Sequence, residues 1–163
     1  MEISMSKELI NEIISDNIKV VESIFSEVDS IMNISKRIIS TFENGGKVVI
    51  FGNGGSAADA QHIAAELSGK FYYEERKGLP AISLNSNTSS ITAIGNDFGF
   101  EYIFSRQLEG LVGEGDIVIG ISTSGNSVNV INGINFANEN GCFTVSLSGS
   151  TGKLKEIVDD CVC

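Results

Sequence analysis

The sequence is poor in the features that mark several broad classes of protein. Its 163 residues include no Trp, one Pro (Pro80), one His (His62) and only 11 Lys and Arg against 21 Asp and Glu. The formal net charge of −10 would repel a nucleic-acid backbone or an anionic membrane, and no basic stripe offsets it. Any anion that the protein binds must therefore be held locally, by N–H groups and hydroxyls.

Cysteine is scarce as well, and long apolar runs are missing. Cys142, Cys161 and Cys163 make an odd count without the spacing of a metal or disulfide framework, which favours a reducing compartment. Cys142 is most simply a small apolar filler in a strand. No apolar stretch approaches the roughly 20 residues that span a bilayer, and the N-terminus lacks the basic-then-apolar pattern of a signal peptide. We expect a soluble, cytoplasmic protein.

Apolar residues at helical spacing fill the N-terminal part of the chain. They predict two helices over residues 4–44, with the Asn-Gly-Gly run at 44–46 ending the second helix. The apolar stripe consists of Ile10, Ile13, Ile14, Val21, Ile24, Val28, Ile31, Ile34, Ile38, Ile39 and Phe42. This N-terminal arm (1–45) covers either the domain's own sheet or a partner subunit, and the sequence leaves both alternatives open.

Beyond Gly46, short apolar runs alternate with helical patterns. Runs without a polar alternation are typical of strands buried on both faces, and strands that alternate with helices indicate a parallel sheet. Strands are expected at 47–51, 79–84, 116–121, 142–147 and 157–163, and helices at 56–69, 88–95, 100–112 and 127–140. The pattern predicts one α/β domain over 1–163, with helices on both faces of a sheet at 46–163.

Two of these strands run directly into loops rich in Gly and Ser. The first loop is Gly-Asn-Gly-Gly-Ser at 52–56, and the second is Ser-Thr-Ser-Gly-Asn-Ser at 122–127. In a parallel sheet both loops lie at the carboxyl edge of the strands, where such folds bind ligands. Glycines let the backbone approach an anion, the following helices offer free N–H groups, and hydroxyls add hydrogen bonds. The loops therefore predict a phosphate site.

The two loops have three other possible interpretations. Residues 52–57 match G-x-G-x-x-A, but the second strand closes at 84–86 without the acidic residue that a dinucleotide site requires. A nucleotide P-loop needs Gly-Lys-Ser/Thr, which follows neither loop. Helix capping by Ser56 and Ser127 requires no ligand, although two such loops at one sheet edge are harder to explain by capping alone.

The helix expected at 56–69 carries Asp59, His62 and Glu66. His62 and Glu66 are four residues apart and share one helix face. Their spacing suits a zinc site that takes further ligands from elsewhere, or a general base steadied by an imidazole. A pair that simply faces solvent is the alternative. Asn96 and Asp97 form a second polar group, which also fits an ordinary helix-ending turn.

With these residues assembled, the chain resembles the SIS family, and within it the isomerases that act on sedoheptulose 7-phosphate. The stretches that carry the resemblance are GNGGSAADAQHIAAELSG (52–69), AIGNDFGFEYIFSRQ (93–107) and GISTSGNSVNVI (120–131). The resemblance runs from about residue 44 onwards, and it implies a three-layer αβα, flavodoxin-like fold with a parallel five-stranded sheet. It also implies a cytoplasmic homotetramer whose active sites are shared between subunits.

The resemblance further implies a reaction and a set of site residues. The reaction is the conversion of sedoheptulose 7-phosphate to D-glycero-D-manno-heptose 7-phosphate through an enediol, supplying heptose for lipopolysaccharide or capsule. Glu66 would be the catalytic base, and His62 and Glu66 would hold one zinc ion per site. The residues implied to contact substrate are Asn53, Gly54, Gly55, Ser56, Glu66, Asn96, Asp97, Ser122, Thr123, Ser124 and Ser127.

One departure and one rival class bear on these expectations. The family continues with a helix bearing Arg-Ile-Gln-Glu-x-His, whose Gln and His complete the metal site. These 163 residues do not include that helix, so we expect either a chain that is cut short or a helix that lies beyond Cys163. The rival class is a non-catalytic SIS protein that binds a sugar phosphate or a replication-initiator protein. The initiator-binding relatives lack the glutamate at Glu66 and break the run at 123–127 with a basic residue. Both features are intact here, which favours the enzyme.

Overall fold

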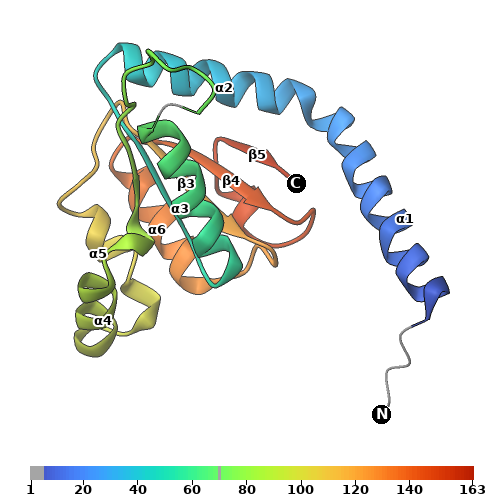
Figure 1. Ribbon diagram of the computed structural model, residues 1–163. Coiled ribbons are helices and arrows are strands. Elements are labelled where there is room, and N and C mark those ends of the chain that lie inside the picture. Colours follow the sequence, from blue (N-terminus) through green and yellow to red (C-terminus); the bar gives the residue numbers. More distant parts are fainter. Residues whose placement is uncertain (1–5, 70) are drawn as a thin grey trace.

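A computed structural model describes residues 6–69 and 71–163. Two N-terminal helices are followed by strands that alternate with helices, as Figure 1 shows. Residues 4 and 5, predicted to be helical, lie outside the described part of the chain. The elements are α1 (Lys7–Ser23), η1 (Ile24–Glu27), α2 (Val28–Glu43), β1 (Val48–Gly52), α3 (Gly55–Ser68), β2 (Ala81–Ser83), η2 (Leu84–Ser86), α4 (Thr88–Asp97), η3 (Phe100–Tyr102), α5 (Ser105–Leu108), β3 (Ile117–Ser122), α6 (Val128–Glu139), β4 (Phe143–Ser148), η4 (Leu154–Glu156) and β5 (Asp160–Val162).

The sheet confirms the predicted fold class. Its five strands pair in the order β2-β1-β3-β4-β5, and every pair is parallel. This is the flavodoxin-like order, in which the direction of strand addition reverses between β1 and β3. Ligands of such sheets bind outside the carboxyl ends of the strands at this switch point. The order therefore brings the loops after β1 and β3 to one place.

The strands form where the sequence is apolar without alternation, because both faces of the sheet are covered. Every residue of β1 and β3 is buried. One core packs α6 and the segment around Phe104 against one face, and a second core packs α2 and α3 against the other. Gly133 lets α6 lie directly on the sheet, since a Cβ there would meet the Phe51 ring at 2.7 Å. These contacts make the expected three layers.

The structure corrects three predicted segments. The helix expected at 100–112 is instead the short η3 followed by the single turn α5, because Ile103 and Phe104 turn into the core while Phe100 stays exposed. The strand expected at 79–84 is only β2, which begins after Pro80, a residue without a backbone N–H for the ladder. The strand expected at 157–163 is shortened to β5.

The N-terminal arm separates into two helices with different surroundings. Ile34, Ile38 and Phe42 of α2 join the core beneath the sheet. No residue of α1 is buried, and the helix extends away from the body of the domain (Figure 1). α1 therefore does not cover this chain's own sheet. Within the described residues, no helix is both long and apolar enough to cross a membrane. The large apolar residues exposed on the arm are Ile10, Ile13, Ile14, Ile18, Val20, Val21, Ile24, Phe25, Val28, Met32 and Ile39.

Candidate active site

The two Gly/Ser loops lie side by side at the switch point of the sheet. Gly52, the last residue of β1, pairs in register with Ile121 of β3, so the loops leave neighbouring strands at the same level. A Cβ on Gly52 would lie 2.7 Å from the Ser56 Cβ and 2.8 Å from the Ile121 carbonyl oxygen. Only glycine fits where α3 turns back over the strand. The predicted meeting of the two loops is confirmed by this geometry.

The first loop turns into α3 without a side-chain cap. Gly54 is the N-cap residue at φ 58°, a left-handed conformation that favours glycine. Ser56 lies inside the helix and its N–H donates to the Asn53 carbonyl at 3.0 Å. Capping by Ser56 is therefore wrong as an explanation of this loop. The N–H groups of Ala57 and Ala58 both donate to the Gly54 carbonyl, so the Gly55 N–H, which has no acceptor among the described residues, is the donor that the start of α3 leaves for an anion.

The second loop also leaves its helix without a side-chain cap. Ser127 is the N-cap residue of α6, but its hydroxyl makes no cap bond and instead pairs with the Ser122 hydroxyl, Oγ to Oγ 3.0 Å. Ser122 is buried, whereas Thr123 and Ser124 are exposed. The loop thus presents several hydroxyls around the N-terminus of α6, which is the arrangement expected for a phosphate site.

Backbone contacts from the segment after β4 fix the second loop. The Gly149 N–H donates to the Thr123 carbonyl at 3.2 Å, and the Leu154 N–H donates to the Gly125 carbonyl at 2.9 Å. Gly125 has φ 64°, and a Cβ there would lie 2.6 Å from the Thr151 carbonyl oxygen. The backbone of the loop is therefore held from behind, while the side chains of Thr123 and Ser124 stay exposed to solvent.

A pair of asparagines joins the two loops, and one of them was missed by the sequence analysis. The Asn53 amide donates to Asn129 Oδ1 at 2.8 Å, and the Asn129 amide donates back to Asn53 Oδ1 at 2.9 Å. Asn129 is 4% exposed, and its Oδ1 also accepts from the Val130 N–H. Asn53, predicted as a substrate contact, thus has its side chain engaged with α6. Asn129 is the second residue of α6 and lies between two valines, so the sequence around it gives no sign that it pairs with Asn53.

His62 and Glu66 lie together on one face of α3, as their spacing predicted. His62 Nε2 is 3.5 Å from Glu66 Oε1, and the side chains are 73% and 42% exposed. An imidazole nitrogen and a carboxylate oxygen at this separation suit zinc, which usually takes four ligands in proteins. No group of three or more His, Cys, Asp and Glu side chains that could hold a metal occurs among residues 6–69 and 71–163. The pair fits as half of a metal site.

Asn96 and Asp97 are the last two residues of α4, and both are exposed. The Asn96 amide donates to Asp97 Oδ1 at 2.8 Å. Among the described residues, no hydrogen bond joins either side chain to the two loops or to Glu66. Their predicted contact with substrate stays a prediction.

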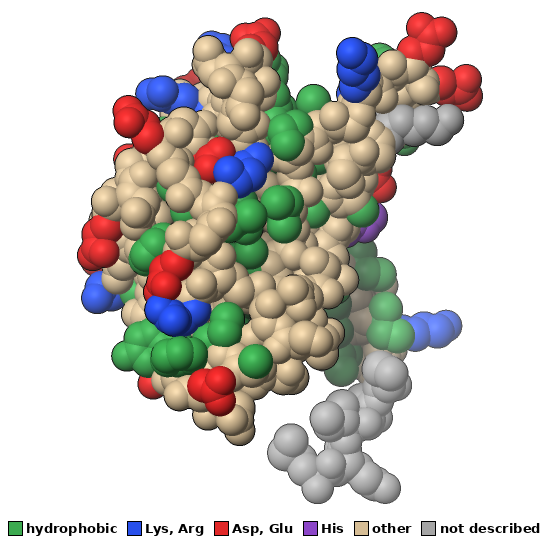
Figure 2. Space-filling model, turned by 90° about the vertical axis from the view of Figure 1, so that its left-hand side faces the viewer, with side chains coloured by type: hydrophobic (Ala, Val, Ile, Leu, Met, Phe, Trp, Pro, Cys, Tyr) green, Lys and Arg blue, Asp and Glu red, His purple; other side chains and the backbone are tan. Residues whose placement is uncertain are grey.

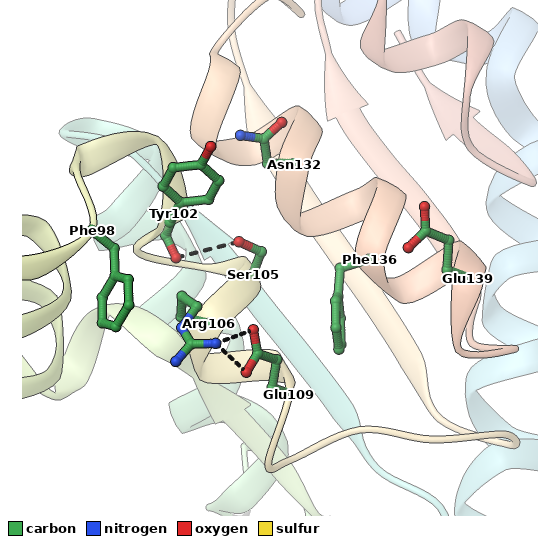
Figure 3. Close-up of a pocket in the computed structure, with 8 residues that line it drawn as sticks. All are labelled: Phe98, Tyr102, Ser105, Arg106, Glu109, Asn132, Phe136 and Glu139. Atoms are coloured by element: carbon green, nitrogen blue, oxygen red, sulfur yellow. Dashed lines mark hydrogen bonds and ion pairs between the residues drawn. The ribbon is translucent and has the colours of Figure 1, made fainter.

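A hollow on the surface lies apart from the predicted site residues. Figure 3 shows it between η3, α5 and α6, with a volume of about 420 Å³. The Arg106 guanidinium lies over the Phe98 ring at 4.5 Å and forms an ion pair with Glu109 at 2.6 Å. Because the Arg106 guanidinium is already paired with Glu109, this hollow is a weaker candidate for anion binding than the two loops. None of the residues predicted for the site lines it.

Charge on the molecular surface agrees with local binding of an anion. On the face seen in Figure 2, basic side chains are interspersed with acidic ones and form no stripe. A positive potential at the two loops would come from the N-termini of α3 and α6 and from hydroxyl dipoles. A parallel α/β domain with two adjoining loops of this kind belongs to the class that binds small phosphorylated ligands at the switch point.

Comparisons with known proteins identify the family. The SIS domain model matches residues 14–149. The phosphoheptose isomerase of Aliarcobacter butzleri is 47% identical over 156 residues, which are 95% of this chain and 82% of that protein. The probable phosphoheptose isomerase of Thermoplasma acidophilum is 54% identical over 134 residues, 82% of this chain and 73% of its own. The solved phosphoheptose isomerase of Neisseria gonorrhoeae superposes with a TM-score of 0.86 at 37% identity, covering 94% and 81% of the two chains.

These likenesses span most of the chain and include both loops and α3. The chain belongs to the SIS-domain family and, within it, to the phosphoheptose isomerases. More distant structures share only the fold: the sugar isomerase domain of a transcription factor from Sphaerobacter thermophilus superposes with a TM-score of 0.66 at 18% identity.

Proposed function

We propose that this chain is a sugar-phosphate isomerase that converts sedoheptulose 7-phosphate to D-glycero-D-manno-heptose 7-phosphate. The observation that carries the proposal is the placement of Glu66 on the same helix whose N-terminus forms half of the anion site. The names of the relatives at 47% and 54% identity support this substrate.

The reaction needs a proton to move between neighbouring carbons. In our proposal the Glu66 carboxylate takes the proton from C1 of the ketose, and the C–H electron pair forms the C1–C2 double bond of an enediol as the C2 carbonyl oxygen takes up a proton. Glu66 then returns its proton to C2 while O1 gives up its own and becomes the aldehyde oxygen. Ser122, Ser124 and Ser127 orient the substrate by its phosphate during both steps.

We propose His62 and Glu66 as two ligands of one zinc ion in each site. Zinc, when bound, acts as a Lewis acid that stabilises negative charge on the sugar oxygens. His62 contributes a neutral ring nitrogen, and its position four residues before Glu66 keeps both donors on one side of α3. The remaining ligands come from outside this pair.

We also propose a homotetramer whose active sites lie at subunit interfaces. The exposed apolar stripe of α1 supports it, because an apolar face of this length is uncommon on a monomer. The 73% exposure of His62 supports a shared site, since proton transfer to carbon benefits from the exclusion of water. The free thiols of the chain support a cytoplasmic enzyme, and its product would serve the heptose of surface polysaccharides.

A non-catalytic SIS protein is the alternative, and Glu66 decides between the two. The substitution Glu66→Gln should lower kcat by about 10²–10⁴-fold, because it removes the base and keeps the shape of the side chain. Glu109→Gln is the matched control, since Glu109 is 43% exposed against 42% for Glu66. Conversion of sedoheptulose 7-phosphate is followed by NMR, together with thermal unfolding. Wild-type turnover by Glu66→Gln would show that Glu66 is not the catalytic base.

A further inference from the structure

The helix that carries Glu66 ends two residues after it, and few contacts from within the helix hold that end. α3 finishes at Ser68, so Glu66 lies in the last turn. The last four carbonyls of a helix have no intrahelical partner, and a helix end without partners frays. The last turn of α3 contains no basic residue that would offset the negative end of the helix dipole. The proposed base is therefore at the least secure end of its helix.

A side chain from the following segment takes up these carbonyls. Arg76 Nη2 donates to the Glu66 carbonyl at 2.7 Å and to the Gly69 carbonyl at 2.8 Å. Arg76 Nη1 donates to the Leu67 carbonyl at 2.9 Å and reaches the Lys77 carbonyl at 3.3 Å. The Leu67 carbonyl also accepts from the Leu79 N–H at 3.0 Å, whereas the Glu66 and Gly69 carbonyls are bound by Arg76. One guanidinium thus binds the C-terminal end of α3 through both of its terminal nitrogens.

The chain returns to this position through a bend that follows α3. Phe71 has φ 42°, a left-handed conformation that is uncommon for a bulky residue and costs energy. Phe71, Tyr72 and Tyr73 are exposed, whereas Arg76 is half-buried. The inward side chain of the segment is the one that bonds to α3. The energetic cost of the Phe71 conformation is therefore offset by the hydrogen bonds of Arg76 to the backbone of α3, the helix that carries Glu66.

We infer that Arg76 is a positioning residue for the isomerase reaction, acting on Glu66 through the backbone of α3. The 3.5 Å separation of His62 and Glu66 exists only while the chain stays helical through residue 66. By holding the last turn, Arg76 fixes where the Glu66 carboxylate stands relative to the loops at the other end of the helix. The planar fork is essential, because a lysine carries all three of its N–H donors on one nitrogen and cannot span the carbonyls that the two terminal nitrogens of Arg76 reach.

This inference rests on the proposed isomerase activity, and its kinetic test uses the full chain. We expect Arg76→Gln to lower kcat about 10-fold or more with KM within about twofold, because a displacement of about 1 Å at a reacting group costs up to about 10²-fold. Arg76→Lys should recover only part of the loss. The matched control is Arg106→Gln. The Arg106 guanidinium also donates to oxygen atoms, but these belong to the Glu109 carboxylate three residues away and not to α3. An unchanged kcat in both Arg76 variants would overturn the inference.

A second measurement tests the clamp without any turnover. Hydrogen exchange should show faster exchange at the amides of residues 66–69 in Arg76→Gln, with those of residues 57–60 unchanged, because the substitution frees only the end of α3. Unchanged exchange at 66–69 would refute the clamp even if the wild-type chain were inactive on sedoheptulose 7-phosphate. An inactive wild type with the expected exchange would refute the proposed function alone. Arg76→Lys supplies the same comparison if Arg76→Gln does not fold.

Discussion

Replacing Asn129 by alanine tests whether the two loops act as one unit. The Asn129 side chain makes three hydrogen bonds: it donates to Asn53 Oδ1 at 2.9 Å, and its Oδ1 accepts from the Asn53 amide at 2.8 Å and from the Val130 N–H at 2.9 Å. Each such bond contributes about 1 kcal/mol net, and a buried partner left unpaired costs about 1–3 kcal/mol. Asn53 is only partly buried and can recover water, so the loss is near the lower end.

We therefore expect Asn129→Ala to lower the free energy of unfolding by about 2–3 kcal/mol. For a chain of this length that corresponds to a fall in Tm of about 5–10 °C. Asn132→Ala is the control on the same helix, because Asn132 makes a single bond to the Glu101 carbonyl at 3.0 Å. It should cost about 1 kcal/mol.

A double-mutant cycle separates the bond between the loops from other effects of the substitution. Denaturant unfolding of Asn53→Ala, Asn129→Ala and the double variant should give a coupling energy of about 1–2 kcal/mol, because removing either partner already removes both mutual bonds. The same variants should bind inorganic phosphate more weakly, since the two loops are no longer held in register. Additive stabilities within about 0.5 kcal/mol would refute the idea that this pair joins the loops.

Three further predictions follow from single contacts. Gly52→Ala should destabilise the fold by about 1–3 kcal/mol in chemical denaturation, because its Cβ would meet the Ser56 Cβ at 2.7 Å, whereas Gly110→Ala, with no atom within 4 Å, should not. Burial raises the pKa of Cys142 to about 11, so the stability contributed by its thiol is present below pH 9 and lost as the pH rises through about 11; Cys142→Ala should flatten that alkaline loss of Tm. Val21→Glu, at a position 63% exposed on α1, should reduce the particle mass in light scattering while Lys19→Glu leaves it unchanged; equal masses for both variants would contradict assembly through α1.

Most of the sheet could be predicted because burial on both faces leaves an unmistakable pattern. Val48–Gly52 has no polar side chain and Ile117–Ser122 has one only at its last residue, since each is a central strand with a helix layer on either side. The edge strands were harder, because β2 and β5 have a neighbour on one side only and need fewer apolar residues. The segment 100–112 misled the prediction because its apolar spacing is helical, while the packing of Ile103 and Phe104 bends the chain after a few residues.

Some residues of the candidate site could be predicted from local sequence, whereas others depend on contacts between segments that are distant in the sequence. The two loops and the His62–Glu66 pair on α3 are each contained in a short stretch of sequence, so residue types and spacing are enough to predict them. Asn129 and Arg76 are different, because each acts on a segment that only the fold brings near: Asn129 lies 76 residues from Asn53, and Arg76 binds carbonyls whose exposure depends on where α3 ends. A backbone carbonyl has no side chain to mark it as a partner, so no pattern in the sequence could have indicated the Arg76 contacts.

The position of the site at the β1/β3 switch point also explains why both helices are needed. Because the strand order reverses there, α3 packs on one face of the sheet and α6 on the other, and their N-termini approach the same edge from opposite sides. One helix alone would offer an anion a partial positive charge of about half a unit, which solvent and salt easily screen. We propose that two converging ends, joined by the Asn53–Asn129 pair, hold the phosphate without a single basic side chain in either loop. A chain with net charge −10 can in this way bind a phosphate and keep a carboxylate base on the same helix.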